Sequence, residues 1–218
     1  PSTSESRPAL LGPHLYPGTA GIALLLAACE RVLGGGMHRD LCLRGLAPLR
    51  QGLDRIIDDP SRANNVQHPI GGLSGIGSLI YSLVTIGDLL DEPTLFQDAH
   101  DLSALITPER IARDDELDVM VGSAGAILAL LALDRQKPGK NRNGVTPLDI
   151  ALACARHLEE RRPSYQGKPR AWTGPEGGAP AGGFCHGAAG ICCALLRLYE
   201  RTGDPDLWQV AQEGLSYE

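Results

Sequence analysis

Four stretches of the chain share one pattern of glycine and apolar positions. Each reads Gly-x-x-Gly and continues into a mostly apolar run. The stretches are GTAGIALLLAAC from Gly18, GLSGIGSLIYSL from Gly72, GSAGAILALLAL from Gly122 and GAAGICCALLRL from Gly187. Counted from the second glycine, apolar residues recur at offsets 1, 4, 5 and 8, which is the spacing of a helix face. Because these helices are apolar nearly all round, we expect them to be buried on both sides.

Amphipathic segments lie between and after these copies. They cover residues 39–58, 94–106, 148–162 and 206–218. The first has a helical pattern despite Pro48, and each carries charge opposite its apolar face, so we expect outer helices. No alternating pattern predicts a strand. The repeating unit is therefore an inner helix that starts with glycine, a loop and an outer helix, and stacking such pairs gives an all-α solenoid or a closed α/α ring.

The paired glycines at each inner-helix start allow two interpretations. The first turn of a helix has unpaired N–H groups and a partial positive charge. Small residues there would let several helix starts converge on one central cavity. The alternative is that glycine serves only close packing.

Composition narrows the classes of partner. The chain has 218 residues and a formal net charge of -6, with both signs scattered. Because the chain has no basic stripe, we expect no nucleic-acid partner. The longest apolar run, 119–133, is shorter than the roughly 20 residues of a membrane span, and we expect no signal peptide. We therefore expect a cytoplasmic protein with reduced thiols, and the first residue, Pro1, suggests a piece of a longer chain.

Two ionisable residues stand at inner-helix starts. His186 directly precedes Gly187, and we interpret it as a neutral proton-transfer base, with a hydrogen-bonded packing residue as the alternative. Asp118 lies four residues before Gly122. It is either a cap or a solvated loop carboxylate, or the acidic group at a cavity mouth one repeat away from His186.

Other polar and sulfur-containing residues receive mostly structural interpretations. Cys185 is next to His186, but zinc needs three or four protein ligands and no convincing further set is present, so we assign no metal ligand. The run 113–116 is charged and predicts a solvated loop. Trp172 lies in a Pro/Gly-rich loop that either covers the cavity or is an ordinary connection. The remaining candidates are assigned to the core (Cys29, Cys192, Cys193) or to loops and outer helices (His14, His68, His100, His157).

The four repeats resemble a known family. LYPGTAGIALLLA, GGLSGIGSLIYSL, DVMVGSAGAILALLAL and GFCHGAAGICCALLRL are similar to successive repeats of the lanthionine synthetase C-like family, nearest to the cyclase half of bifunctional class II lanthipeptide synthetases. This resemblance implies an α/α toroid of seven inner and seven outer helices, of which about four pairs are present. It also implies a flexible start over 1–14 and a partial cyclase domain over 15–218.

The resemblance further implies a reaction. A peptide Cys thiol adds to dehydroalanine or dehydrobutyrine in a lanthipeptide precursor, with a dehydratase domain in the same longer chain. Zinc binds that thiol in the complete enzyme, through ligands expected beyond Glu218, and Cys185 is a local substitution rather than a ligand. His186 transfers protons and Asp118 is its acidic partner. The alternatives are a non-catalytic helical-repeat module that binds a peptide or thiol, and another α/α-toroid enzyme, whose usual paired acids are not evident here.

Overall fold

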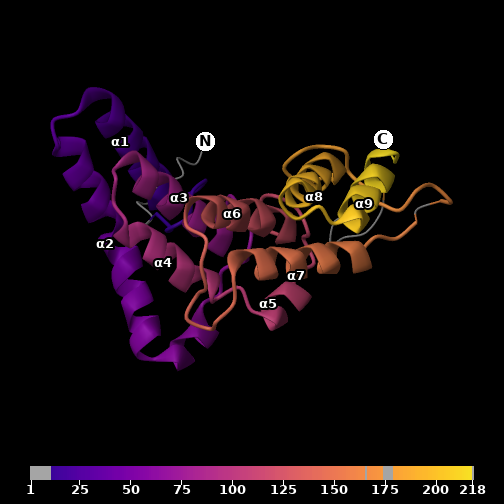
Figure 1. Cartoon of the computed structure of the whole chain (residues 1–218), viewed down its shortest axis with the longest axis horizontal. Helices are drawn as coiled ribbons and strands as arrows, with labels where there is room; N and C mark the ends of the chain where they lie inside the picture. The colour runs from indigo at the N-terminus through magenta and orange to yellow at the C-terminus, as the bar shows by residue number, and fades with distance from the viewer. Residues whose placement is uncertain (1–10, 165, 174–178, 218) are drawn as a thin grey trace, which may run out of the picture.

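The computed structural model describes residues 11–164, 166–173 and 179–217, which form helices and contain no strand. Four helix pairs follow one another along the chain from the indigo end to the yellow end (Figure 1). The elements in chain order are α1 (Thr19–Leu33), α2 (Met37–Asp58), η1 (Pro60–Asn65), α3 (Ile76–Leu89), α4 (Thr94–Ser103), α5 (Pro108–Ala112), α6 (Ser123–Gln136), α7 (Pro147–Glu160), α8 (Ala188–Thr202) and α9 (Pro205–Leu215).

The pairing confirms the predicted all-α unit. Helix α1 packs on α2, α3 on α4, α6 on α7 and α8 on α9. The glycine-started helices also contact one another in the order α1, α3, α6, α8, so they form the inner layer. Pro48 lies inside α2 without ending it. Some outer helices are a few residues shorter at their C-terminal end than the apolar pattern predicts. For example, α4 ends at Ser103, whereas the pattern continues to residue 106.

The hydrophobic pattern did not predict η1 and α5, because both elements are too short to show a helical period. Asp59 accepts a hydrogen bond from the backbone N–H of Ser61 at the start of η1. Thr107 does the same for Arg110 at the start of α5. Each capping residue is followed by proline, so the local signal for a helix start was present.

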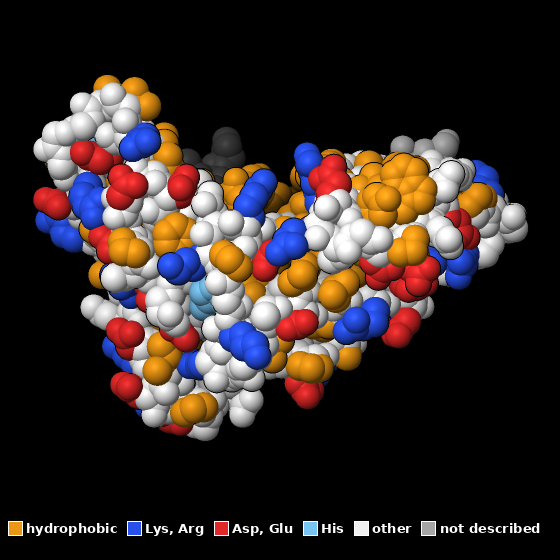
Figure 2. Space-filling view, viewed as in Figure 1, with side chains coloured by type: hydrophobic (Ala, Val, Ile, Leu, Met, Phe, Trp, Pro, Cys, Tyr) orange, Lys and Arg blue, Asp and Glu red, His pale blue; other side chains and the backbone are white. Residues whose placement is uncertain are grey.

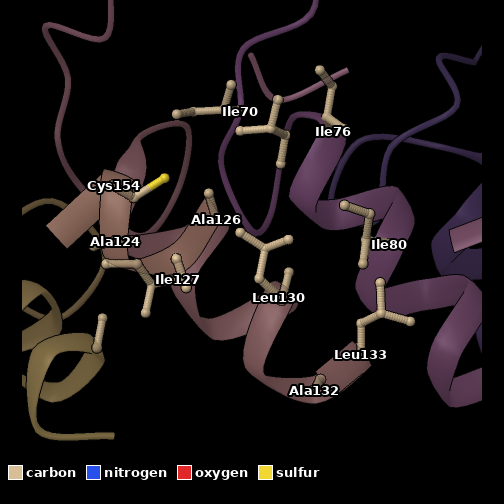
Figure 3. Close-up of a cluster of buried hydrophobic side chains, with 14 of the residues drawn as sticks. Ile70, Ile76, Ile80, Ala124, Ala126, Ile127, Leu130, Ala132, Leu133 and Cys154 are labelled. Carbon is tan, nitrogen blue, oxygen red and sulfur yellow. The ribbon is translucent and has the colours of Figure 1, made fainter. Parts of the chain in front are cut away.

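The two middle inner helices are buried on both sides, as predicted. Leu130 and Leu133 of α6 point toward Ile80 of α3, and Ile127 lies nearer to α8 (Figure 3). The prediction is wrong for α1, whose Ile22 and Leu25 are 50% and 64% exposed. The reason is that α1 packs on a single inner neighbour, α3, within the described residues.

Apolar side chains are also exposed at the other end of the arc. Trp208 and Leu215 of α9 are about half exposed, and an apolar cluster covers α9 in the space-filling view (Figure 2). Elsewhere on this face both signs of charge are interspersed (Figure 2). The first and the last described helix pairs therefore both expose large apolar side chains.

The start of the second repeat differs from the prediction. Helix α3 begins at Ile76 with Gly75 as its N-cap, whereas the pattern was counted from Gly72. Gly75 thus corresponds to the N-caps of the other inner helices, and Ser78 stands where they have their second glycine. The glycine-rich sequence is compatible with a helix start at Gly72 or at Gly75. The loop decides between them, because a Cβ on Gly75 would overlap the carbonyl oxygen of Pro69.

The inner-helix starts are closed by their own loops. In each repeat one N–H at the helix start donates to the carbonyl oxygen seven residues earlier, from the first helical residue in α1, α3 and α8 and from the second in α6. These bonds are Thr19 to Gly12 (2.9 Å), Ile76 to Pro69 (2.8 Å), Ala124 to Leu117 (3.1 Å) and Ala188 to Ala181 (2.8 Å). A Cβ on the second glycine of three repeats (Gly21, Gly125, Gly190) would overlap the carbonyl oxygen six residues earlier. The second glycine therefore serves close packing of the loop, and these first-turn N–H groups do not face an open cavity.

Candidate functional site

The loops before the four inner helices lie against one another. The backbone N–H of Tyr16 donates to the carbonyl oxygen of Leu73 (3.0 Å), that of Leu73 to Met120 (3.1 Å) and that of Met120 to Cys185 (3.3 Å). All four residues stand two positions before the N-cap of their inner helix. Because each loop also wraps its own helix start in the same way, neighbouring loops have a constant register.

This register brings two particular positions together. The residue four before one N-cap lies beside the residue directly before the next N-cap. In the second and third repeats these are Gly71 and Val121, and a Cβ on Gly71 would overlap the backbone of Val121. In the third and fourth repeats the same two positions hold Asp118 and His186. The repeat geometry thus explains why the two candidates meet across 68 residues of sequence.

Asp118 and His186 form a hydrogen-bonded pair. His186 Nδ1 lies 2.6 Å from Asp118 Oδ2. The Asp118 side chain is 4% exposed, whereas the imidazole is 65% exposed. Asp118 Oδ1 accepts the backbone N–H groups of Val121 (2.8 Å) and Gly122 (3.2 Å). The carboxylate is therefore held as an acceptor, Nδ1 donates to it, and Nε2 is the ring nitrogen left for other partners.

Both sequence interpretations of Asp118 describe part of its environment. It caps the turn that leads into α6, as a structural carboxylate would, and its second oxygen orients an imidazole from the next repeat. His186 has no packing role of the kind considered for it, since most of its ring is exposed.

The charged run beside this pair is not a simple solvated loop. Asp114 is 8% exposed and accepts the backbone N–H of Ser123 at 2.7 Å, together with the Ser123 hydroxyl. It therefore fixes the first residue of α6. Sequence reasoning missed this role because the partner lies nine residues away in no recurrent motif.

Glu116 is the third carboxyl group of this region. Burial raises the pKa of Glu116, and the negative charges of Asp118 and Asp114 raise it further, while His186 acts in the opposite direction. The charge of Glu116 therefore interacts with the charges of Asp118 and His186.

Trp172 has neither of the roles proposed for it. It is 2% exposed, and its indole N–H donates to the carbonyl oxygen of Leu158 at 2.8 Å. A Cβ on Gly214 of α9 would overlap its ring. Trp172 therefore anchors its loop between α7 and α9 instead of covering a cavity. Residues 174–178 of that loop lie outside the described residues.

The cysteines differ in exposure. Cys185 is exposed, Cys42, Cys154 and Cys192 are buried, and Cys29 and Cys193 are half-buried. Burial raises the pKa of the Cys42 thiol to about 11 and raises that of Cys154 more strongly. Buried thiols of this kind remain protonated and unreactive at neutral pH.

The described residues do not fit a zinc ion. Within them, no group of three or more His, Cys, Asp or Glu side chains converges as metal ligands would. The neighbours Cys185 and His186 alone are too few, and the imidazole Nδ1 is already engaged by Asp118.

Stacked helix pairs with glycine-started inner helices, and a hydrogen-bonded Asp–His pair where two loops meet, define a helical-repeat protein with an ionisable dyad at a loop junction. The family model described as lanthionine synthetase C-like protein matches residues 10–218. The chain therefore belongs to the lanthionine synthetase C-like family, which confirms the resemblance seen in the four repeats. A comparison with curated proteins found no match. Of the 1–14 segment predicted to be a flexible start, 1–10 lie outside the described residues, and 11–14 belong to the loop before α1.

No helix among the described residues is long and apolar enough to cross a membrane.

Proposed function

We propose that this protein forms thioether rings in a lanthipeptide precursor by adding a peptide Cys thiol to dehydroalanine or dehydrobutyrine. Membership of the lanthionine synthetase C-like family supports this class of reaction. The observation that carries the proposal is the 2.6 Å contact between His186 Nδ1 and the buried Asp118 carboxylate.

The reaction needs one proton to be removed and one to be delivered. A carbon–sulfur bond forms at the β-carbon of the alkene, the thiol loses its proton, and the α-carbon gains one. Nothing leaves, and no electron carrier is needed. The exposed His186 Nε2 accepts the thiol proton and then, as part of an imidazolium, donates a proton to the enolate carbon. A single nitrogen thus returns to its starting state in each turnover.

Asp118 fixes the tautomer of the neutral His186 ring before the reaction starts. Because Oδ2 accepts the Nδ1 proton, the lone pair of the neutral ring is at Nε2, where the thiol can reach it. When the ring gains a proton, the carboxylate stabilises the positive charge. The two backbone N–H groups on Oδ1 keep the carboxylate from turning away.

The proposal extends to the surroundings of this chemistry. Zinc would serve the complete enzyme through ligands beyond Glu218. A dehydratase domain in the same longer protein would supply the dehydrated peptide, and both would be cytoplasmic. His186 and Asp118 are the residues of this chain assigned to proton transfer.

The test is His186→Ala in the complete, zinc-repleted protein. Ring closure leaves the peptide mass unchanged but consumes a thiol, so maleimide labelling followed by mass spectrometry measures it. We expect the rate to fall by about 10²–10⁴-fold, the usual contribution of a general acid–base group. Binding of a fluorescein-labelled dehydrated peptide should change by no more than about twofold, because the imidazole acts on the reacting atoms.

His38→Ala in α2 is the matched control and should keep the full rate, because His38 lies beside Glu30 in the first helix pair. An unchanged rate in His186→Ala would contradict the proposal. Loss of the circular-dichroism signal in that variant would make His186 structural. Peptide binding by the wild type without any ring closure would identify a binding module instead.

A further inference from the structure

A groove of about 1070 Å³ runs between two connecting segments and reaches Glu116 and Val121, the neighbours of Asp118 in the loop before α6, while Asp118 and His186 themselves do not line it. One wall is formed by residues 57–70, which include η1, and the other by residues 104–116, which include α5. Val121 also lines it, and the N–H of Val121 donates to Asp118. Glu116, whose charge interacts with those of His186 and Asp118, lines the same end.

The two walls are tied together by one guanidinium group. Arg110 Nη2 donates to the carbonyl oxygens of Ala63 (2.9 Å) and Val66 (2.7 Å), and Nη1 donates to that of His68 (3.3 Å). The groove is therefore held open by protein contacts, and a ligand would not have to order it. These bonds engage Arg110, which leaves recognition to other side chains.

Carboxamide and arginine side chains of the groove remain available to bind a ligand. In the part of the chain that the structure describes, four exposed side chains of these two kinds make no hydrogen bond or ion pair, those of Asn64, Gln67, Arg113 and Arg142. Carboxamides of this kind both donate to and accept from a peptide backbone. Two of the acidic side chains in the lining, those of Asp114 and Asp115, are already engaged, the first by Ser123 and the second by Arg161.

Charge differs between the two ends of the groove. Arg142 stands near the start of the 104–116 wall, because its neighbour Asn143 donates to the carbonyl oxygen of Ala104 at 3.3 Å. Glu116 stands at the end of the same wall, next to the dyad. Residues 109–116 of this wall carry four acidic and two basic side chains, so an acidic group on a ligand would be repelled there and attracted at the Arg142 end.

We propose that this groove holds the stretch of substrate peptide that flanks the reacting residue, with an acidic side chain of the peptide against Arg142. The inference rests on the function proposed above. Its grounds are the volume, at the upper end of the roughly 300–1,000 Å³ of small-molecule pockets, the available carboxamides, and Arg142 at the end away from the acidic residues of 109–116. Substrates would thus carry Asp or Glu at a distance from the ring-forming residue and not directly beside it.

The probes are short synthetic peptides that contain one dehydroalanine and one cysteine and carry fluorescein. Three versions differ only in one residue of the flank, which is Asp, Asn or Lys. Anisotropy measures binding, and maleimide labelling measures ring closure, both in the complete protein. We expect the wild type to bind the Asp peptide about fivefold more tightly than the Lys peptide, as for one solvent-exposed charge pair.

Arg142→Glu should reverse this preference, whereas Arg197→Glu on α8, outside the groove and paired with Glu200, should preserve it. If the wild type closes rings and Arg142→Glu keeps the Asp preference, the groove assignment is wrong and the proposed function stands. If the Asp preference depends on Arg142 but no ring closes, the groove stands and the proposed function fails. If none of the peptides binds, both are overturned.

Discussion

Replacing Asp118 by Asn separates its two roles, because the amide can keep one of them and must lose the other. The amide oxygen can still accept the N–H groups of Val121 and Gly122. Its NH₂ group then faces His186 Nδ1, at the place where Oδ2 accepted a proton. The imidazole has to accept there, so its proton moves to Nε2, and the exposed nitrogen can no longer take a proton from a thiol.

The expected magnitudes follow from these bonds. An imidazole held in the wrong tautomer loses a factor on the order of 10³–10⁴ in rate, as in the serine-protease triad. Asp118→Asn exchanges one charge-assisted hydrogen bond for a neutral one, which costs about 1 kcal/mol of unfolding free energy. Asp118→Ala also leaves two N–H groups without their acceptor, at about 1–3 kcal/mol each. Both variants are therefore inactive, but only the alanine variant is strongly destabilised.

Two measurements check this reasoning. Maleimide labelling of the product peptide gives the rate of ring closure, and urea unfolding followed by circular dichroism gives the free energy of unfolding. Asp118→Asn should keep the unfolding free energy to within about 1 kcal/mol of wild type while losing activity. An asparagine variant within tenfold of the wild-type rate would refute the tautomer argument. Equal stability of the alanine and asparagine variants would refute the capping argument.

Three further predictions concern packing, pH and metal. Gly125→Ala forces a methyl group onto the backbone of Val119 and Gly72 and should lower the free energy of unfolding in urea by about 3 kcal/mol or more. Gly45 is exposed in α2 with open space around it, so Gly45→Ala should raise that free energy by about 0.5–1 kcal/mol. Equal effects of the two substitutions would contradict the packing role of Gly125. Burial lowers the pKa of His14 below 6.5, so the unfolded chain binds the proton more readily and stability should be complete above pH 6.5 and fall below it. His14→Asn keeps an acceptor for the Gly75 N–H and should flatten this dependence in melting curves; an unchanged pH slope would show that another group titrates. After zinc repletion, atomic absorption of this chain should find no bound zinc with or without Cys185→Ala, and about one zinc per chain that is lost with Cys185 would make Cys185 a ligand.

The candidate site could be predicted only in part from the sequence. His186 and Asp118 stood out because an ionisable residue beside a glycine-started helix is unusual in an otherwise apolar pattern. Asp114 did not, because its partner Ser123 follows it by nine residues in a charged run that suggested solvent. Trp172 was misjudged for a similar reason, since a Pro/Gly-rich loop gives no sign that one of its side chains is inserted between α7 and α9.

The sequence by itself determined the all-α class, the alternation of inner and outer helices and the two members of the dyad. These follow from local periodicity and from residue types at helix starts, which depend little on distant contacts. Only the tertiary structure decided that the second repeat starts at Gly75, that the first-turn N–H groups are closed by their own loops, and that Asp118 contacts His186 at 2.6 Å. Each of these depends on loops from different repeats lying in one register, and the steric overlaps that set this register arise only when the loops are packed together.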